Sequence, residues 1–138
     1  MRVDMSITAE WEEFDNDLKV TCHEMEIKDE NDIPQLVAAT TQETDGEEVL
    51  LVAGPEDSQR RFTFQYNKDR TLVYVHYIQI GLGTYFVAEG DPESPELFTS
   101  SGGSFYPGSG LTPQKFETVL REFVRTKEKP TTISWKAL

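Results

Sequence analysis

The hydrophobic residues near the C-terminus recur at the spacing of an α-helix. Thr112 carries a hydroxyl that can cap the first turn, and Pro113 is compatible with the first helical position. The apolar positions that follow would form one buried face, and they are Phe116, Val119, Leu120, Phe123 and Val124. The pair Lys129-Pro130 would end the helix. The pattern therefore predicts an amphipathic helix that packs against a core.

A weaker helical pattern lies in the first third of the chain. Asn31 or Asp32 would cap this helix at its start. Leu36 and Val37 give it a modest apolar face, and Asp45-Gly46 would end it. We therefore expect a second, less amphipathic helix here.

Alternating apolar and polar residues predict two strands within residues 1–27. The second strand has Leu18, Val20 and Cys22 on one face. The polar stretch FDND, at residues 14–17, is compatible with a hairpin turn between the two strands.

Residues 49–88 are predicted to form the body of a sheet. Residues 70–80 (RTLVYVHYIQI) are apolar on both faces, which is typical of a central strand covered on both sides. Short strands are also predicted at residues 84–90 (TYFVAEG) and at residues 131–135 (TTISW). Together the elements predict a single α+β domain over residues 1–138. Its mainly antiparallel β-sheet would have about six to seven strands, with two helices packed on it.

Negative charge is concentrated in the first part of the chain. The 138 residues carry a formal net charge of −12, and residues 1–58 hold 17 of the 25 acidic side chains. The same segment has three basic residues, Arg2, Lys19 and Lys28. Such a field disfavours direct binding to nucleic acid and steers a basic protein partner toward the chain. Solubility alone is the alternative explanation of this acidity.

Cysteine content and hydropathy indicate the compartment. Cys22 is the single cysteine, which excludes an intrachain disulfide, and a lone cysteine is most often a small buried residue. No apolar run reaches the ~20 residues that a membrane span needs, and the N-terminal residues lack the apolar core of a signal peptide. We therefore expect a cytoplasmic protein without a membrane partner.

The candidate catalytic and metal-binding residues are isolated from one another. His23 and His76 fall inside predicted strands, and Ser109 has no nearby base to activate it. Residues 15–17 (DND) lack the glycine and the glutamate that a calcium loop requires. The GLG at residues 81–83 joins two strands and opens no helix, so it does not indicate a dinucleotide site. The sequence predicts no enzyme activity, no metal and no cofactor.

The region from Thr84 to Tyr106 is the candidate partner-binding surface, because it mixes aromatic rings with carboxylates. Aromatic side chains supply rigid contact area, and carboxylates pair with lysine or arginine across an interface. The candidate contact residues are Tyr85, Phe86, Glu89, Asp91, Glu93, Glu96 and Tyr106. The alternative is that the aromatic residues belong to the core and the acids are ordinary loop residues.

Residues 105–135 (FYPGSGLTPQKFETVLREFVRTKEKPTTISW) resemble the end of a family of bacterial immunity proteins. These are small cytosolic proteins paired with polymorphic toxins, especially deaminase toxins. The shared pattern is a Gly/Pro-rich loop, an amphipathic helix, and a strand that closes on a tryptophan. Phe123, Thr126, Pro130 and Trp135 occupy the corresponding positions. A looser similarity extends over residues 31–138.

The resemblance implies a protein that binds a cognate toxin domain and covers its active site. The toxin would present a basic active-site surface, which an acidic inhibitor complements. No catalytic residue carries over from the family, and Phe123, Pro130 and Trp135 carry over as scaffold residues only. An acidic cytosolic secretion chaperone for an effector protein is the alternative, and it would be distinguished by dimerisation and by binding to an unfolded segment.

Overall fold

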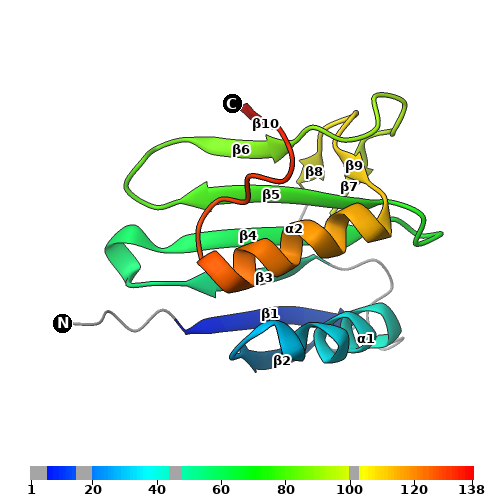
Figure 1. Ribbon diagram of the computed structural model, residues 1–138. Coiled ribbons are helices and arrows are strands. Elements are labelled where there is room, and N and C mark those ends of the chain that lie inside the picture. Colours follow the sequence, from blue (N-terminus) through cyan, green and yellow to red (C-terminus); the bar gives the residue numbers. More distant parts are fainter. Residues whose placement is uncertain (1–5, 15–19, 44–47, 100–102) are drawn as a thin grey trace.

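The computed structural model describes residues 6–14, 20–43, 48–99 and 103–138. Its main element is an antiparallel sheet with the strand order β10-β6-β5-β4-β3-β1-β2, and β9 pairs with β5 (Figure 1). The strands of this sheet are β1 (Ile7–Phe14), β2 (Val20–Ile27), β3 (Val49–Ala53), β4 (Arg60–Tyr66), β5 (Val73–Gln79), β6 (Tyr85–Ala88), β9 (Gly110–Leu111) and β10 (Trp135–Ala137). This architecture confirms the predicted α+β class with a mainly antiparallel sheet and two helices.

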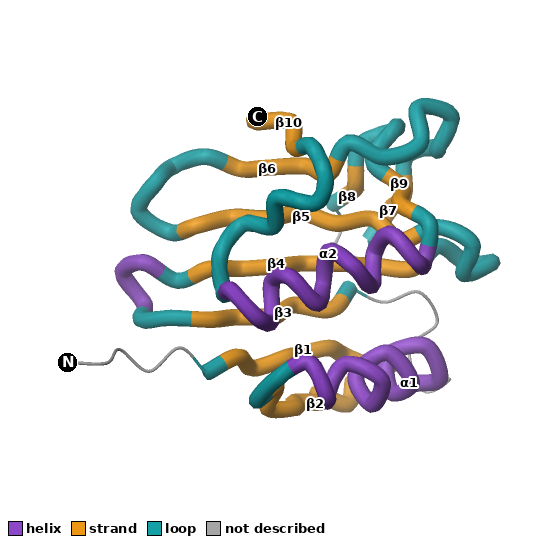
Figure 2. The backbone as a smooth tube through the Cα atoms, in the orientation of Figure 1, coloured by secondary structure: helices purple, strands orange, loops and turns teal. Residues whose placement is uncertain are grey.

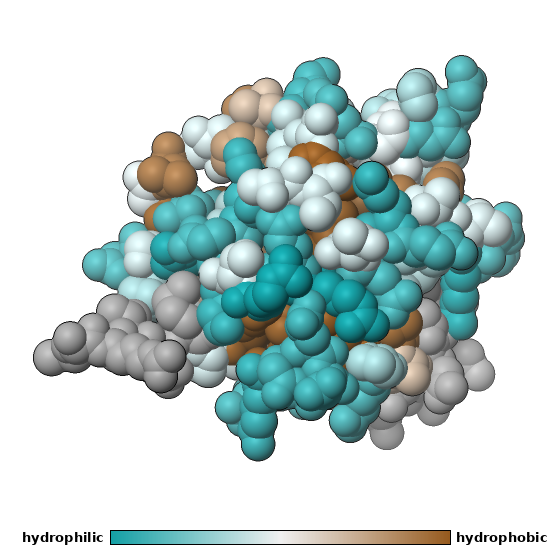
Figure 3. Space-filling view, viewed as in Figure 1, coloured by the Kyte–Doolittle hydropathy of each residue, from teal (hydrophilic) through white to brown (hydrophobic). Residues whose placement is uncertain are grey.

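The two α-helices are α1 (Ile33–Glu43) and α2 (Pro113–Thr126), and both pack on the same face of the sheet. Short 3-10 turns, η1 (Glu30–Asp32) and η2 (Glu56–Ser58), precede α1 and β4. Ile33 and Leu36 of α1 are fully buried in the same cluster as Ile7 and Ile27. On the side of the helices, the outer surface of the molecule is covered mainly by hydrophilic side chains (Figure 3). The helices therefore form one layer between the core and solvent.

The predicted apolar stripe of α2 is confirmed as the centre of the core. Phe116 lies 4.7 Å from Phe64, and Phe123 stacks on Phe62 at 4.9 Å between ring centroids. All five residues of the stripe are at most 1% exposed. The Thr112 hydroxyl caps the helix by accepting a hydrogen bond from the backbone N–H of Lys115, as the sequence predicts.

The prediction that Cys22 is buried is wrong. Within β2, the buried residue Ile27 and the partly buried Met25 point to the helices, and His23 stacks on Trp11 at 5.5 Å. Cys22 alternates with these residues, so it lies on the opposite face, where it is exposed. The proposed turn at residues 14–17 falls largely outside the described residues, as does the predicted helix end at Asp45-Gly46.

A second, two-stranded sheet covers part of the opposite face. It consists of β7 (Leu97–Phe98) and β8 (Ser104–Phe105). The ring of Phe105, fully buried, lies 4.1 Å from the ring of His76 on the central strand β5. This contact explains why β5 is apolar on both faces, as its sequence predicts.

Side-chain hydrogen bonds hold the C-terminal segment against α2. The carboxylate of Glu122 accepts hydrogen bonds from the backbone N–H groups of Thr131 (2.6 Å) and Thr132 (3.0 Å). The indole N–H of Trp135 donates to the carbonyl oxygen of Pro130 at 2.7 Å. Pro130 is buried, and the Trp135 ring lies 6.1 Å from Tyr77. These contacts position β10 beside β6.

Candidate partner-binding face

The face of the main sheet that points away from α1 and α2 is called the open face here. Because side chains alternate along a strand, the residues between the buried ones lie on this face. On β1 to β4 they are Thr8, Glu10, Glu12, Val20, Cys22, Glu24, Glu26, Leu50, Val52, Arg61, Thr63 and Gln65. On β5 and β6 they are Tyr74, His76, Ile78, Tyr85 and Val87.

Strand register arranges the acidic residues of the open face in rows. Glu24 of β2 lies opposite Glu10 of β1, which lies opposite Leu50 of β3. In the next row, Glu26 lies opposite Thr8, and Thr8 lies opposite Val52. Both glutamates of β2 and both open-face glutamates of β1 are exposed. The result is an acidic margin, formed by β1 and β2, beside partly buried apolar residues on β3.

Aromatic side chains stand at the other side of the open face. Phe98 of β7 is 72% exposed and Tyr106 is 51% exposed. The backbone carbonyl of Phe98 accepts a hydrogen bond from the side-chain amide of Gln65 on β4 at 3.3 Å. Burial raises the pKa of Tyr85, whose hydroxyl contacts Nδ1 of His76 on β5. The aromatic and acidic parts of the chain therefore share one side of the sheet.

Two of the predicted contact residues, Tyr85 and Phe86, point to opposite faces of the sheet because they are successive residues of β6. Tyr85 lies on the open face. Phe86 points to the helix side, 6.3 Å from the ring of Tyr77 and beneath the ammonium group of Lys129, which is 4.0 Å from its centroid. Tyr85 thus lies on the open face, whereas Phe86 lies among residues of the opposite layer.

The predicted acidic contact residues lie on the loop after β6, which Figure 2 shows at one end of the sheet. Glu89, Asp91, Glu93 and Glu96 are all exposed. The Asp91 carboxylate accepts a hydrogen bond from the backbone N–H of Glu93 at 2.9 Å, and Glu96 accepts one from the Ser104 hydroxyl at 3.3 Å. The loop acids are therefore partly engaged in shaping their own loop.

Close backbone approach fixes this loop against β9. A Cβ atom on Gly90 would overlap the carbonyl oxygen of Gly110. The backbone N–H of Asp91 donates to that same carbonyl at 2.8 Å, and the Ser94 hydroxyl accepts from the Gly110 N–H at 3.0 Å. Glycine at position 90 is what allows the loop to lie this close.

Comparison with known families identifies the chain. The model of the family described as "Immunity protein Imm1" matches residues 11–137, which is nearly the whole chain. The chain belongs to the Imm1 immunity protein family. A comparison with curated proteins gave no match. The family assignment confirms the resemblance to bacterial immunity proteins that residues 105–135 indicate.

Phe98 and the acidic margin lie outside the seven contact residues that the sequence predicts for this Imm1 protein. Phe98 falls within the candidate region from Thr84 to Tyr106, and the acidic residues of 10–32 are the next candidates from the sequence. In β1 and β2 the signal was present, because glutamates recur at every second position in EWE and in EME. Placing the two sets on one face requires the pairing of the strands, which a period of two alone does not provide.

His76 is a buried histidine of this Imm1 protein and lies opposite Thr63 of β4. Its Nδ1 lies 2.5 Å from the hydroxyl of Tyr85, while its Nε2 has no hydrogen-bond partner among the described residues. Burial lowers the pKa of His76 to about 4. His76 is therefore neutral in the folded protein at neutral pH and is packed between Tyr85 and Phe105. This supports a structural role for the side chain.

We expect the lowered pKa of His76 to make stability pH-dependent. The unfolded chain binds a proton at His76 below about pH 6.5, and the folded chain does so only below about pH 4. The neutral His76 ring therefore contributes its full stabilisation above about pH 6.5. The free energy of unfolding falls by about 2 kcal/mol between pH 7 and 5 as the unfolded chain takes up the proton. Urea unfolding across this range measures the effect. A His76→Gln variant should lose this part of the pH dependence, and an unchanged slope would contradict the assignment.

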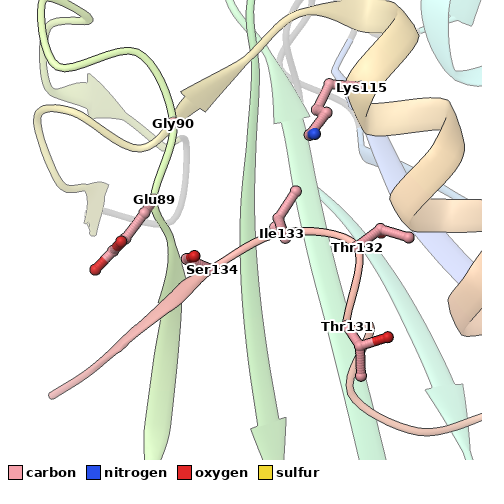
Figure 4. Close-up of a pocket in the computed structure, with 7 residues that line it drawn as sticks. All are labelled: Glu89, Gly90, Lys115, Thr131, Thr132, Ile133 and Ser134. Carbon is pink, nitrogen blue, oxygen red and sulfur yellow. The ribbon is translucent and has the colours of Figure 1, made fainter.

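A shallow polar depression of about 460 Å³ lies on the helix side of the Imm1 fold. Figure 4 shows Lys115 of α2 reaching over it, with Glu89 pointing away. The Thr131 hydroxyl donates to Glu122 at 3.0 Å, so this hydroxyl is already engaged. The depression therefore marks the place where α2, the loop after β6 and the C-terminal segment meet.

Within the ranges that the structure describes, no group of three or more His, Cys, Asp or Glu residues is arranged to hold a metal ion. None of the helices in those ranges is long and apolar enough to cross a membrane.

Proposed function

We propose that this Imm1 protein binds a cognate bacterial toxin domain in the cytoplasm and inhibits it by covering its active site. The observation that carries the proposal is the open face, which combines exposed glutamates with exposed aromatic rings. Aromatic side chains are the usual anchors of a protein interface, and the surrounding charges select the partner.

The toxin is proposed to be a nucleic-acid deaminase with a basic active-site surface. An enzyme that holds nucleic acid presents lysine and arginine to the phosphates. An inhibitor with a net charge of −12 complements such a surface and repels the nucleic acid itself. The proposed partner is therefore the toxin protein, with no direct nucleic acid contact, no membrane and no cofactor.

Co-expression with the toxin domain encoded by the adjacent gene tests this function. We expect the Imm1 protein to protect the cells and to elute from gel filtration as a complex with the toxin domain. Killing at an unchanged rate, together with no complex, would reject the proposal. A dimer that binds an unfolded toxin segment and leaves toxin activity unchanged would support a secretion chaperone instead.

The loop after β6 is expected to contribute to the rate of toxin binding. Reversing Glu89, Asp91, Glu93 and Glu96 to lysine should slow association about tenfold at low salt, because rim charges act mainly on diffusional encounter. The fold should persist, since all four side chains are exposed. Stopped-flow or surface-based binding at two salt concentrations measures the effect. An unchanged association rate would place the contacts outside this loop.

A further inference from the structure

We propose that the toxin docks on the acidic margin of the open face. This margin consists of Glu10 and Glu12 of β1 with Glu24 and Glu26 of β2, and it adjoins Leu50 and Val52 of β3. The inference rests on the proposed function and names the surface that performs it. The partner recognised is a basic protein surface that carries lysine or arginine around an apolar contact.

The described residues leave this area uncovered. Both α-helices lie on the other face, and the β7–β8 hairpin covers the open face at β5, through Phe105, and at Gln65 of β4. Among the described residues, the four glutamates and Cys22 are exposed, and Leu50 and Val52 are partly exposed. An antiparallel sheet commonly has one solvated, polar face, and here that face carries four exposed glutamates on two adjacent strands.

The charge pattern of the acidic margin destabilises the sheet. Glu10 and Glu24 are directly opposite each other on paired strands. Like charges at such positions destabilise a sheet. The strands β1 and β2 contain no lysine or arginine that could offset the repulsion. A partner that brings cations to this margin converts the repulsion into ion pairs, whereas solubility would be served by any arrangement of the same charges.

The sign of the charge determines which class of partner can occupy the acidic margin. A second copy of the chain, related by a two-fold axis, would bring the same acidic rows together and increase the repulsion. Nucleic acid is excluded by charge in the same way. A basic protein surface is the remaining class of occupant with complementary charge.

Neighbouring features extend the same surface toward β4. The exposed ring of Phe98 is tied by its carbonyl to Gln65, which lies one strand beyond β3. Gln65 is 3% exposed, and its Oε1 has no hydrogen-bond partner among the described residues. Adjacent strands are about 4.8 Å apart, so Glu24 and Gln65 span roughly 15 Å. An interface of ordinary size covers both.

The experiment reverses charge on β2 without weakening the sheet. Glu24→Lys places a lysine opposite Glu10, so we expect its melting temperature to equal or exceed that of the wild type. Association with the toxin domain encoded by the adjacent gene should slow about tenfold at low salt for Glu24→Lys, and more for Glu24→Lys/Glu26→Lys. Glu56→Lys is the matched control, because it makes the same charge change on the exposed η2 turn and should associate at the wild-type rate.

Cys22 provides a second readout in the wild-type protein. It is exposed and lies opposite Glu12, within the proposed footprint. We expect the toxin domain to slow alkylation of Cys22 by iodoacetamide at least tenfold, as measured by mass spectrometry of the peptide that contains it. This measurement does not depend on any variant folding.

The outcomes separate the two proposals. If Glu24→Lys associates at the wild-type rate, and Cys22 is alkylated at an undiminished rate in the toxin complex, the proposed footprint is overturned while the inhibitory function stands. A wild-type protein that neither binds nor inhibits the toxin would overturn the function and the footprint together. Slowed association of Glu24→Lys with a retained melting temperature, together with protection of Cys22, supports the footprint.

Discussion

Replacing Phe123 by alanine is expected to lower the free energy of unfolding by about 4 kcal/mol. The ring is fully buried, stacks on Phe62 at 4.9 Å and meets Tyr77 edge-on at 6.2 Å. Truncation removes these contacts and leaves a cavity between α2 and the sheet, which the surrounding strands cannot close because they are paired on both sides. Urea unfolding followed by tryptophan fluorescence measures the loss.

The matched control is Arg121→Ala on the same helix. Arg121 is exposed, and its ion pair with Glu117 is 3.8 Å long, so its removal should change stability by at most about 0.5 kcal/mol. A loss below about 1 kcal/mol for Phe123→Ala would contradict the placement of this ring at the centre of the core.

Phe123→Ala is expected to lower stability without changing the recognition of the toxin domain. Phe123 lies on the helix side, so the folded fraction of Phe123→Ala should bind the toxin domain at the wild-type rate. Protection in cells would fall only through reduced abundance, because destabilised proteins are removed by proteases. Charge reversal at Glu24 is expected to act in the opposite way, with retained abundance and slower association.

Local patterns were sufficient to predict the elements of the core. The stripe of α2 repeats at helical spacing over nine residues, and β5 is apolar at successive positions. Each pattern depends on neighbours in sequence alone. The same holds for the Thr112 cap, because the hydroxyl bonds within its own helix turn.

Properties that depend on pairing could not be predicted in the same way. Val20 and Cys22 of β2 resemble a buried face locally, but Glu24 and Glu26 continue that same face and Ile27 lies on the other. The sequence of this edge strand alone does not determine which of its two faces is buried. A shift of the strand register by one residue would move every side chain to the other face. The acidic margin emerges only when β2 and β3 are placed on either side of β1, which their order in the sequence does not indicate.

The second large effect is expected at Glu122, whose carboxylate is the anchor of the C-terminal segment. It is 7% exposed and accepts three hydrogen bonds from the backbone and side chain of Thr131 and the backbone of Thr132. We expect Glu122→Ala to lower the free energy of unfolding by about 3 kcal/mol. Hydrogen bonds to a charged acceptor are strong, and all three donors lose their acceptor at once when the carboxylate is removed.

The pH dependence of Glu122 follows from the same contacts. Burial raises the pKa of the carboxyl group, but the hydrogen bonds from Thr131 and Thr132 outweigh burial, and the net pKa lies below its ordinary value. A carboxyl with a lowered pKa stabilises the fold fully above its unfolded pKa, and this contribution is lost as the pH falls through the folded pKa. The difference in stability between the wild type and Glu122→Ala should therefore narrow in acid.

Glu122→Gln is the matched variant, because it keeps the shape of the side chain and one acceptor oxygen while removing the charge. We expect it to lose about half as much stability as alanine and to show no narrowing of the difference in acid. Since β10 is held beside β6 by this segment, hydrogen exchange at Trp135 to Ala137 should accelerate in Glu122→Ala before exchange in β4 does. Equal acceleration throughout the sheet would indicate that Glu122 supports the whole core and not specifically the strand that closes it.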